Sequence, residues 1–443
     1  MTRSTSKKRA PGSKRKVDLI LVGAGELVTL AGPPGPRVGR GMAELGAIAD
    51  GALAVKDGMI ALVGTSEQVL SACELSPEGM MIDAAGCLVI PGLVDPHTHA
   101  VFGAFRRGEL ALRLTGAAYM NIHGSGGGIH RTVRETREAP VERLLEVLSA
   151  NLREMLCNGT TTAEVKSGYG LTLEHEAREL AAIREARVIG PMDIESTFLG
   201  AHAIPGEFEG RADAYVELIC EEMLPRVVHD GLARFCDVFC EPGAFSAAQS
   251  RRVLETARSL GLRLKVHADE FCHSGGAELA ADLGAISADH LLKTTEEGLR
   301  ALRASGTIAV LLPAAPFALS LAGYADARRM VELGIPVALG TDFNPGPGCV
   351  SSMQIIIGLA CLQMKLAPAE ALVAATLNAA HAVGRGEEVG SLVPGKQADF
   401  VVMNAESHEA IPYFFGRNLV SLVVKSGQPV VRKHDGLVAQ NGR

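Results

Sequence analysis

From residue 88 to about 385, short apolar runs alternate with longer amphipathic stretches. The apolar runs predict strands at 88–99, 160–166, 195–202, 235–241, 262–268, 285–290, 307–312 and 336–342. Between them, apolar residues recur every three or four positions, for example in 141–155, 247–260 and 367–383, which predicts helices. Eight strands that alternate with helices over about 300 residues are typical of an α/β protein with a TIM-like (β/α)₈ barrel.

Both ends of the chain show a different pattern. Residues 17–88 and 388–443 contain short apolar runs without helical periodicity, and Lys56-Asp57-Gly58 has the composition of a hairpin turn. We expect these two segments to pack together as one composite β-sandwich domain. The barrel then occupies residues 89–387.

Composition adds a few limits to this picture. Residues 1–16 mix Lys and Arg with Ser, Gly and Pro, which predicts a disordered basic arm rather than a signal peptide. The net charge of −7 gives no reason to expect a nucleic-acid partner. No apolar run approaches the roughly 18 residues that span a membrane. Nine cysteines without a Cys-x-x-Cys pair favour a cytoplasmic location.

The predicted strands end in residues that bind metals. The first ends in His97 and His99, which point to the same side because strand side chains alternate with a period of two. The fifth ends in His267, the sixth in His290 and the eighth in Asp342. Barrel enzymes carry their reactive groups at these carboxyl ends of the strands, so the side chains should converge on one rim.

Three imidazoles and a carboxylate suit one Zn²⁺ or Fe ion that keeps a position open for water. A single histidine at a strand end is more often structural, but the combination favours a metal site. His97, His99, His267 and Asp342 are the expected ligands. Glu270 lies three residues beyond a ligand and can transfer the proton of the water, and His290 is an outer-sphere partner or electrophile. We therefore expect Glu270, His290 and Asp342 to be catalytic.

A second ion is the less favoured alternative. Binuclear sites of this kind use a carbamylated lysine on the fourth strand. Here the fourth strand ends in Glu241, and the nearest suggestive lysine, Lys166, ends the second strand.

Several motifs resemble the amidohydrolase superfamily and, within it, the imidazolonepropionase family. The Ser-Gly-Tyr-Gly and Leu-Gly-Ala-His segments are specific to that family within the superfamily. The matching stretches are 91–99, 126–129, 132–134, 136–137, 164–171, 197–202, 237–241, 267–270, 274–278, 287–290 and 341–346.

The resemblance implies a reaction and a substrate site. It implies that a metal-activated water opens the ring amide of 4-imidazolone-5-propanoate, a small-molecule substrate, to give N-formimidoyl-L-glutamate in histidine catabolism. It assigns the substrate carboxylate to Arg106 with Tyr119 and Tyr169, and a hydrogen bond to the ring to His202. The remaining polar and backbone contacts are assigned to Asn344 and Gly346. A homodimer is expected by the same analogy.

The chain departs from the family pattern near the site. After Gly346, where the family usually carries Ser or Thr, this chain has Pro347-Gly348-Cys349. Residues 312–317 lack the aromatic pair that the family pattern leads us to expect. His123 and His130 add polarity at 123–130. Another amidohydrolase that acts on a different N-heterocycle, such as an aminohydrolase that releases ammonia, is therefore the first alternative. A non-catalytic assembly protein is disfavoured because all four ligands are retained.

Overall fold

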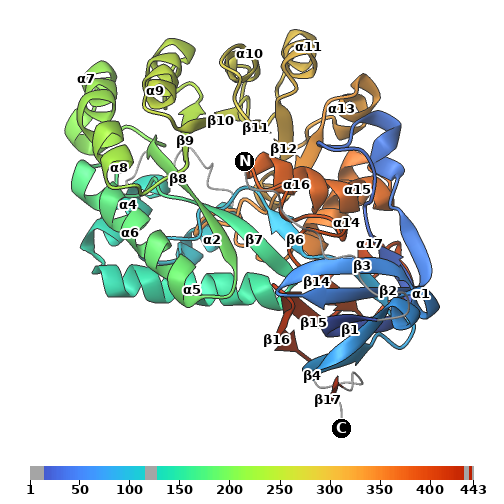
Figure 1. Cartoon of the computed structure of the whole chain (residues 1–443). Helices are drawn as coiled ribbons and strands as arrows, with labels where there is room; N and C mark the ends of the chain where they lie inside the picture. The colour runs from blue at the N-terminus through green and yellow to red at the C-terminus, as the bar shows by residue number, and fades with distance from the viewer. Residues whose placement is uncertain (1–13, 115–126, 434–438, 442–443) are drawn as a thin grey trace, which may run out of the picture.

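The computed structural model describes residues 14–114, 127–433 and 439–441. Its larger part is a nearly closed parallel barrel of eight strands, ordered β6 to β13 as in the sequence (Figure 1). This confirms the predicted fold class. The barrel strands are β6 (Leu93–Asp95), β7 (Thr160–Lys166), β8 (Asp193–Ala201), β9 (Phe235–Cys240), β10 (Arg263–Ala268), β11 (Ser287–His290), β12 (Ile308–Leu311) and β13 (Val337–Leu339).

The barrel closes at the carboxyl ends of its first and last strands. β6 and β13 are joined there by an isolated parallel bridge between Thr98 and Phe343. The His99 amide donates to the Phe343 carbonyl at 2.8 Å, and the Asp342 amide donates to the His97 carbonyl at 3.1 Å. The seam of the barrel is thus made by the same short segments that carry three of the predicted ligands.

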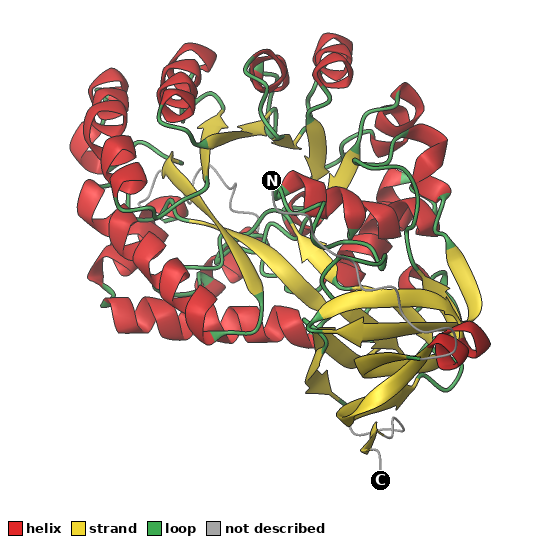
Figure 2. Ribbon diagram, in the orientation of Figure 1, coloured by secondary structure: helices red, strands yellow, loops and turns green. Residues whose placement is uncertain are grey.

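Helices surround the barrel, as Figure 2 shows in red around the yellow strands. The predicted helix 367–383 is two helices, because the Ala375 carbonyl accepts a hydrogen bond from Val94 of β6 at 3.0 Å and the helical path breaks at Thr376. The helices are α2 (Arg107–Leu114), α4 (Ile129–Glu138), α5 (Val141–Cys157), α6 (Leu173–Ile189), α7 (Ala212–Leu218), α8 (Leu224–His229), α9 (Ala247–Ser259), α10 (Gly276–Asp282), α11 (Glu296–Ser305), α12 (Ala314–Ala318), α13 (Ala327–Leu333), α14 (Met353–Met364), α15 (Pro368–Ala374), α16 (Leu377–Ala382) and α17 (Ala410–Tyr413).

The N- and C-terminal segments form a separate nine-stranded sheet beside the barrel (Figure 1). The predicted hairpin turn is present, since Asp57 and Gly58 both have positive φ and join two paired strands. The strands of this sheet are β1 (Arg15–Val28), β2 (Ala47–Lys56), β3 (Met59–Thr65), β4 (Cys73–Asp83), β5 (Leu88–Pro91), β14 (Phe400–Met403), β15 (Val420–Lys425), β16 (Gln428–Arg432) and β17 (Ala439–Asn441), with helix α1 (Ser66–Ala72) between β3 and β4.

The predicted first strand, 88–99, is divided between the two sheets. Residues 88–91 form β5, which pairs with β1 and β14, and only 93–95 form the barrel strand β6. Gly92 lies at the transition, where an added Cβ would overlap the Thr161 hydroxyl. The tight approach to Thr161 therefore requires glycine at this position. In the described part of the chain, no helix combines the length and hydropathy that a membrane crossing requires.

Candidate metal centre

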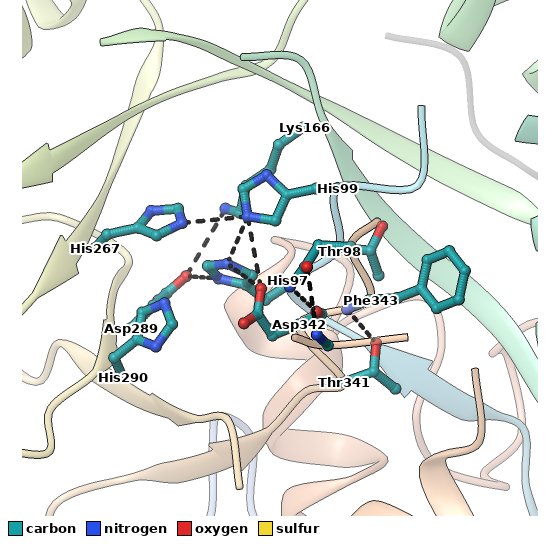
Figure 3. Close-up of polar contacts among 12 residues, drawn as sticks. His97, Thr98, His99, Lys166, His267, Asp289, His290, Thr341, Asp342 and Phe343 are labelled. Atoms are coloured by element: carbon teal, nitrogen blue, oxygen red, sulfur yellow. Dashed lines mark hydrogen bonds and ion pairs between the residues drawn. The ribbon is translucent and has the colours of Figure 1, made fainter. Parts of the chain in front are cut away.

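The four predicted ligands meet at the barrel rim, although they come from three strands. His97 and His99 follow β6, His267 lies in β10, and Asp342 follows β13. The Nε2 atom of His99 is 3.3 Å from Nε2 of His97 and 3.3 Å from Nε2 of His267. The Oδ1 atom of Asp342 is 3.7 Å from Nε2 of both His97 and His99 (Figure 3).

These separations fit a metal ion. Ligands about 2.0–2.1 Å from a tetrahedral ion are about 3.3 Å from one another. All four side chains are buried. Buried ring nitrogens that face one another lack a hydrogen-bond partner, which is costly unless they bind a common ion. Burial raises the pKa of Asp342 to about 7, and a dication at this point would favour its ionised form.

Two carboxylates behind the histidines set the ring tautomers. Nδ1 of His97 lies 2.6 Å from Oδ2 of Asp289, and Nδ1 of His267 lies 2.9 Å from Oδ2 of Asp237. Because an ionised carboxylate only accepts, the hydrogen bond to Asp289 keeps the proton of His97 on Nδ1, so that the lone pair of its Nε2 faces the centre. The Asp237 carboxylate beside His267 favours the same tautomer there. The sequence interpretation did not give Asp237 or Asp289 a role, although both lie in strands whose final residues it examined.

A layer of buried ions lies beneath this centre. The ammonium of Lys166 contacts Asp237 at 2.7 Å, Glu164 at 3.0 Å and Asp289 at 3.8 Å, and Lys265 contacts Glu164 at 2.9 Å. Burial alone lowers the pKa of Lys166, but the three carboxylates outweigh burial and raise the pKa. Lys166 therefore remains a cation, which is the form that does not become carbamylated.

Glu270 and His290 lie beside the four ligands. Oε1 of Glu270 is 3.7 Å from Nδ1 of His290, and both side chains line the same pocket as His99 and Asp342. Burial raises the pKa of Glu270 well above its ordinary range, and the charges of Asp342 and Glu241 raise it further. Glu241 also accepts hydrogen bonds from the Glu270 amide at 3.2 Å and the Cys272 amide at 2.7 Å, a role that the sequence did not indicate.

His202 and Tyr169 form one wall of the pocket. Nδ1 of His202 donates to the Gly168 carbonyl at 3.0 Å, and its ring stacks on His99 with centroids 4.9 Å apart. Burial lowers the pKa of His202 to about 3. The ring is therefore neutral, and its Nε2 is a hydrogen-bond acceptor.

The loop that carries Tyr169 is fastened to helix α6 by two buried glutamates. Glu176 accepts from the amides of Gly170 at 3.0 Å and Leu171 at 2.7 Å, and Glu179 accepts from the Tyr169 amide at 3.2 Å. Burial raises the pKa of both carboxyl groups. The backbone of this loop is thereby fixed from behind, away from the pocket.

Arg106 also lines this pocket and is buried. Its Nε and Nη1 atoms have no hydrogen-bond partner among the described residues, and the Glu109 carboxylate lies 3.8 Å from Nε. An added Cβ on Gly346 would overlap the Arg106 guanidinium, so this glycine makes room for the arginine. Tyr119, the other predicted carboxylate contact, lies outside the described residues, as does His123.

The loop after β13 differs from the expectation in detail. The Asn344 amide donates to the Asp342 carbonyl at 2.8 Å and accepts from the Gly346 amide at 2.8 Å. Asn344 and Pro347 line the pocket, as does His130 from α4. The polar atoms of Asn344 and the amide of Gly346 thus organise the loop, and their direct contact with a substrate remains a prediction.

Four residues at the strand ends have positive φ without being glycine. They are Asp269 (51°), His290 (75°), Leu291 (61°) and Asp342 (50°). Such conformations are costly for side chains with a Cβ and concentrate at functional sites. Their presence at the ends of β10, β11 and β13 agrees with a site built at this rim.

Comparisons with known proteins were made on sequence and on structure. The amidohydrolase family model matches residues 88–430. An imidazolonepropionase from Symbiobacterium thermophilum is 53% identical over 418 residues, covering 94% of this chain and 98% of that protein. One from Geobacillus kaustophilus is 48% identical, with 94% and 98% covered.

Two solved structures share the fold at low sequence identity. An adenosine deaminase from Xanthomonas campestris with bound zinc has a TM-score of 0.69 at 19% identity, covering 95% of this chain and 94% of that chain. The guanine deaminase of E. coli has a TM-score of 0.69 at 18% identity, with 94% and 99% covered.

Proposed function

The chain belongs to the amidohydrolase family and, within it, to the imidazolonepropionases, and from this premise we propose how its site works. It is a metal-dependent hydrolase of cyclic amide C–N bonds. The substrate is 4-imidazolone-5-propanoate and the product is N-formimidoyl-L-glutamate. The observation that carries the proposal is that Nε2 of His99 lies 3.3 Å from Nε2 of both His97 and His267. Oδ1 of Asp342 lies 3.7 Å from Nε2 of both His97 and His99. Beside them are a buried glutamate and an arginine with two nitrogens that have no hydrogen-bond partner among the described residues.

His97, His99, His267 and Asp342 hold one divalent ion, Zn²⁺ or Fe²⁺. When bound, such an ion lowers the pKa of water towards about 7 and polarises a carbonyl oxygen. A single ion is favoured because Lys166 is engaged by three carboxylates and is not free to form a bridging carbamate.

Glu270 transfers the proton. It accepts a proton from the attacking water and delivers it to the ring nitrogen that leaves when the C–N bond breaks. The raised pKa of Glu270 suits both halves of this transfer, because the group must hold the proton between the two steps. His290, 3.7 Å from Glu270, donates to the carbonyl oxygen as negative charge develops there.

Arg106 and His202 orient the substrate. The guanidinium of Arg106 lines the pocket, and its Nε and Nη1 atoms have no hydrogen-bond partner within the part of the chain that the structure describes. A propionate carboxylate can accept from such a guanidinium as a bidentate pair. The Nε2 atom of His202 accepts from a ring N–H of the imidazolone. Tyr169 packs against His202, with ring centroids 5.3 Å apart.

The test is turnover by the purified, metal-loaded chain. We expect 4-imidazolone-5-propanoate to be consumed with formation of N-formimidoyl-glutamate and without release of ammonia. His267→Ala should abolish turnover and metal retention together. Ammonia release from another N-heterocycle, with no formimidoyl-glutamate, would favour an aminohydrolase instead. A homodimer and a cytoplasmic location remain predictions, and light scattering of the purified chain tests the former.

A further inference from the structure

Lys166 lies directly behind two of the three histidines that we propose as ligands. Its Nζ atom is 2.7 Å from Oδ2 of Asp237 and 3.8 Å from Oδ2 of Asp289. The same two oxygens lie 2.9 Å from Nδ1 of His267 and 2.6 Å from Nδ1 of His97. One ammonium thus terminates two ammonium–carboxylate–imidazole chains that end at the same centre. Figure 3 shows the chain that runs through Asp289 to His97.

We propose that Lys166 is a positioning residue for the metal, which it serves by fixing Asp237 and Asp289 so that His267 and His97 aim at one point. The inference rests on the proposed ligand set. Carboxylates that bind the second nitrogen of a ligand histidine fix the orientation of its ring, and their loss typically weakens metal binding about 10- to 100-fold. Lys166 contacts both of these carboxylates, so it couples the orientations of the His267 and His97 rings.

The surroundings of Lys166 favour this role over a purely structural one. The ammonium donates hydrogen bonds to Asp237 and Glu164 and forms a longer ion pair with Asp289 at 3.8 Å. Lys265 pairs with Glu164 at 2.9 Å, and all five side chains are fully buried. Buried ion networks are often no more stabilising than a packed apolar core. Folding stability therefore does little to explain why five charged side chains lie inside the barrel. Their effect on the orientation of the metal ligands explains it directly.

Lys425 is a matched control within the same chain. It is also a buried lysine between two carboxylates, with Asp193 and Asp399 each 2.9 Å from its Nζ atom. It lies in β15 of the second sheet and touches none of the proposed ligands. Removing Lys166 takes the ammonium from three carboxylates, and removing Lys425 takes it from two. Of those two, Asp193 is part-exposed and keeps Arg385 at 3.2 Å, so the Lys425 variant controls for loss of a buried ammonium away from the site.

The experiment measures Zn²⁺ affinity of the full chain after removal of metal, by titration with Zn²⁺ against a competing chelator. We expect Lys166→Met to weaken Zn²⁺ binding about tenfold or more. Lys425→Met should lower the midpoint of unfolding and leave Zn²⁺ affinity within about twofold of the unsubstituted chain. The double variant Lys166→Met/Asp289→Asn should lose less than the product of the two single losses, because both act on the same ring.

The outcomes are distinct. If the unsubstituted chain binds no Zn²⁺, the proposed function falls and this inference with it. If it binds Zn²⁺ and Lys166→Met binds equally well, the inference alone is overturned. If Lys166→Met does not fold, Lys166→Gln, which keeps an amide donor without the charge, is titrated in its place. Unchanged affinity there overturns the inference, and weakened affinity with an unchanged Lys425→Met supports it.

Discussion

Arg106 is the residue whose substitution most directly tests the substrate. Two of its guanidinium nitrogens are buried without a hydrogen-bond partner among the described residues. A charge-assisted hydrogen bond is worth about 1.5–3 kcal/mol, which corresponds to about 10- to 100-fold in affinity. We expect Arg106→Met to raise KM by that factor with a smaller change in kcat. The neighbouring, exposed Arg107 is the control, and an equal effect of Arg107→Met would contradict the assignment.

Glu270 tests the chemistry at the same scale. Glu270→Gln removes the proton carrier but keeps the size of the side chain and leaves the four proposed ligands intact. We expect kcat to fall about 10²- to 10⁴-fold, the usual contribution of a general acid–base group. Metal content, measured on the same preparation, should not change. Glu255→Gln, on the exposed face of α9, is the control. A kcat within a few-fold of normal would exclude Glu270 as the proton carrier.

The sequence indicated the proposed metal ligands because parallel strands end on the same side of a barrel, whereas Arg106 was indicated only by the resemblance to the family. A histidine or aspartate that ends a predicted strand is therefore expected at the carboxyl-terminal rim of the barrel. The partners behind the ligands could not be predicted in the same way. Asp289 contacts His97, which is 192 positions away, and Glu241 accepts from the Glu270 amide through a loop conformation. Such pairs depend on side-chain packing, which strand endings do not determine.

Helix α6 contributes to the site without reaching it. Glu176 on α6 accepts from the amides of Gly170 and Leu171, and so fixes the loop that carries Tyr169. Glu176→Ala leaves two backbone donors buried and unpaired, which costs about 1–3 kcal/mol for each unsatisfied group. We expect lower stability in urea and a higher KM.

The control for this prediction is the exposed Glu174 in the first turn of the same helix. Glu174→Ala should change neither stability nor KM measurably. If Glu176→Ala lowers stability but leaves KM unchanged, α6 supports the fold and does not shape the pocket.

Secondary structure was predicted well where an apolar pattern belonged to one element, and poorly where the pattern ran through two elements. The apolar part of the predicted strand, 88–94, has no polar side chain to divide it, yet at Gly92 the chain passes from the second sheet into the barrel. Similarly, the periodicity of 367–383 continues through Ala375, whose carbonyl is taken by Val94. In both cases a tertiary hydrogen bond or close contact overrides a continuous local pattern.

At the scale of the whole molecule, the proposed metal lies across the seam of the barrel. His97 and His99 follow the first barrel strand and Asp342 follows the last, and an isolated bridge between Thr98 and Phe343 joins these ends. A bound ion therefore links the two edges that the strand ladder leaves weakly joined. Binding to the folded state alone stabilises it, by about 2.7 kcal/mol when free metal is 100 times Kd.

Chelation of the metal should accordingly lower the midpoint of thermal unfolding and loosen this seam first. In hydrogen exchange, the amides of His99 and Asp342, which bond across the seam, should lose protection in the metal-free chain. The amide of Ile286, which bonds to the Leu264 carbonyl at 2.9 Å on the far side of the barrel, should keep its protection. His267→Ala should remove the difference between the two forms. Equal protection of the seam amides with and without metal would mean that the first and last strands hold together without the ion.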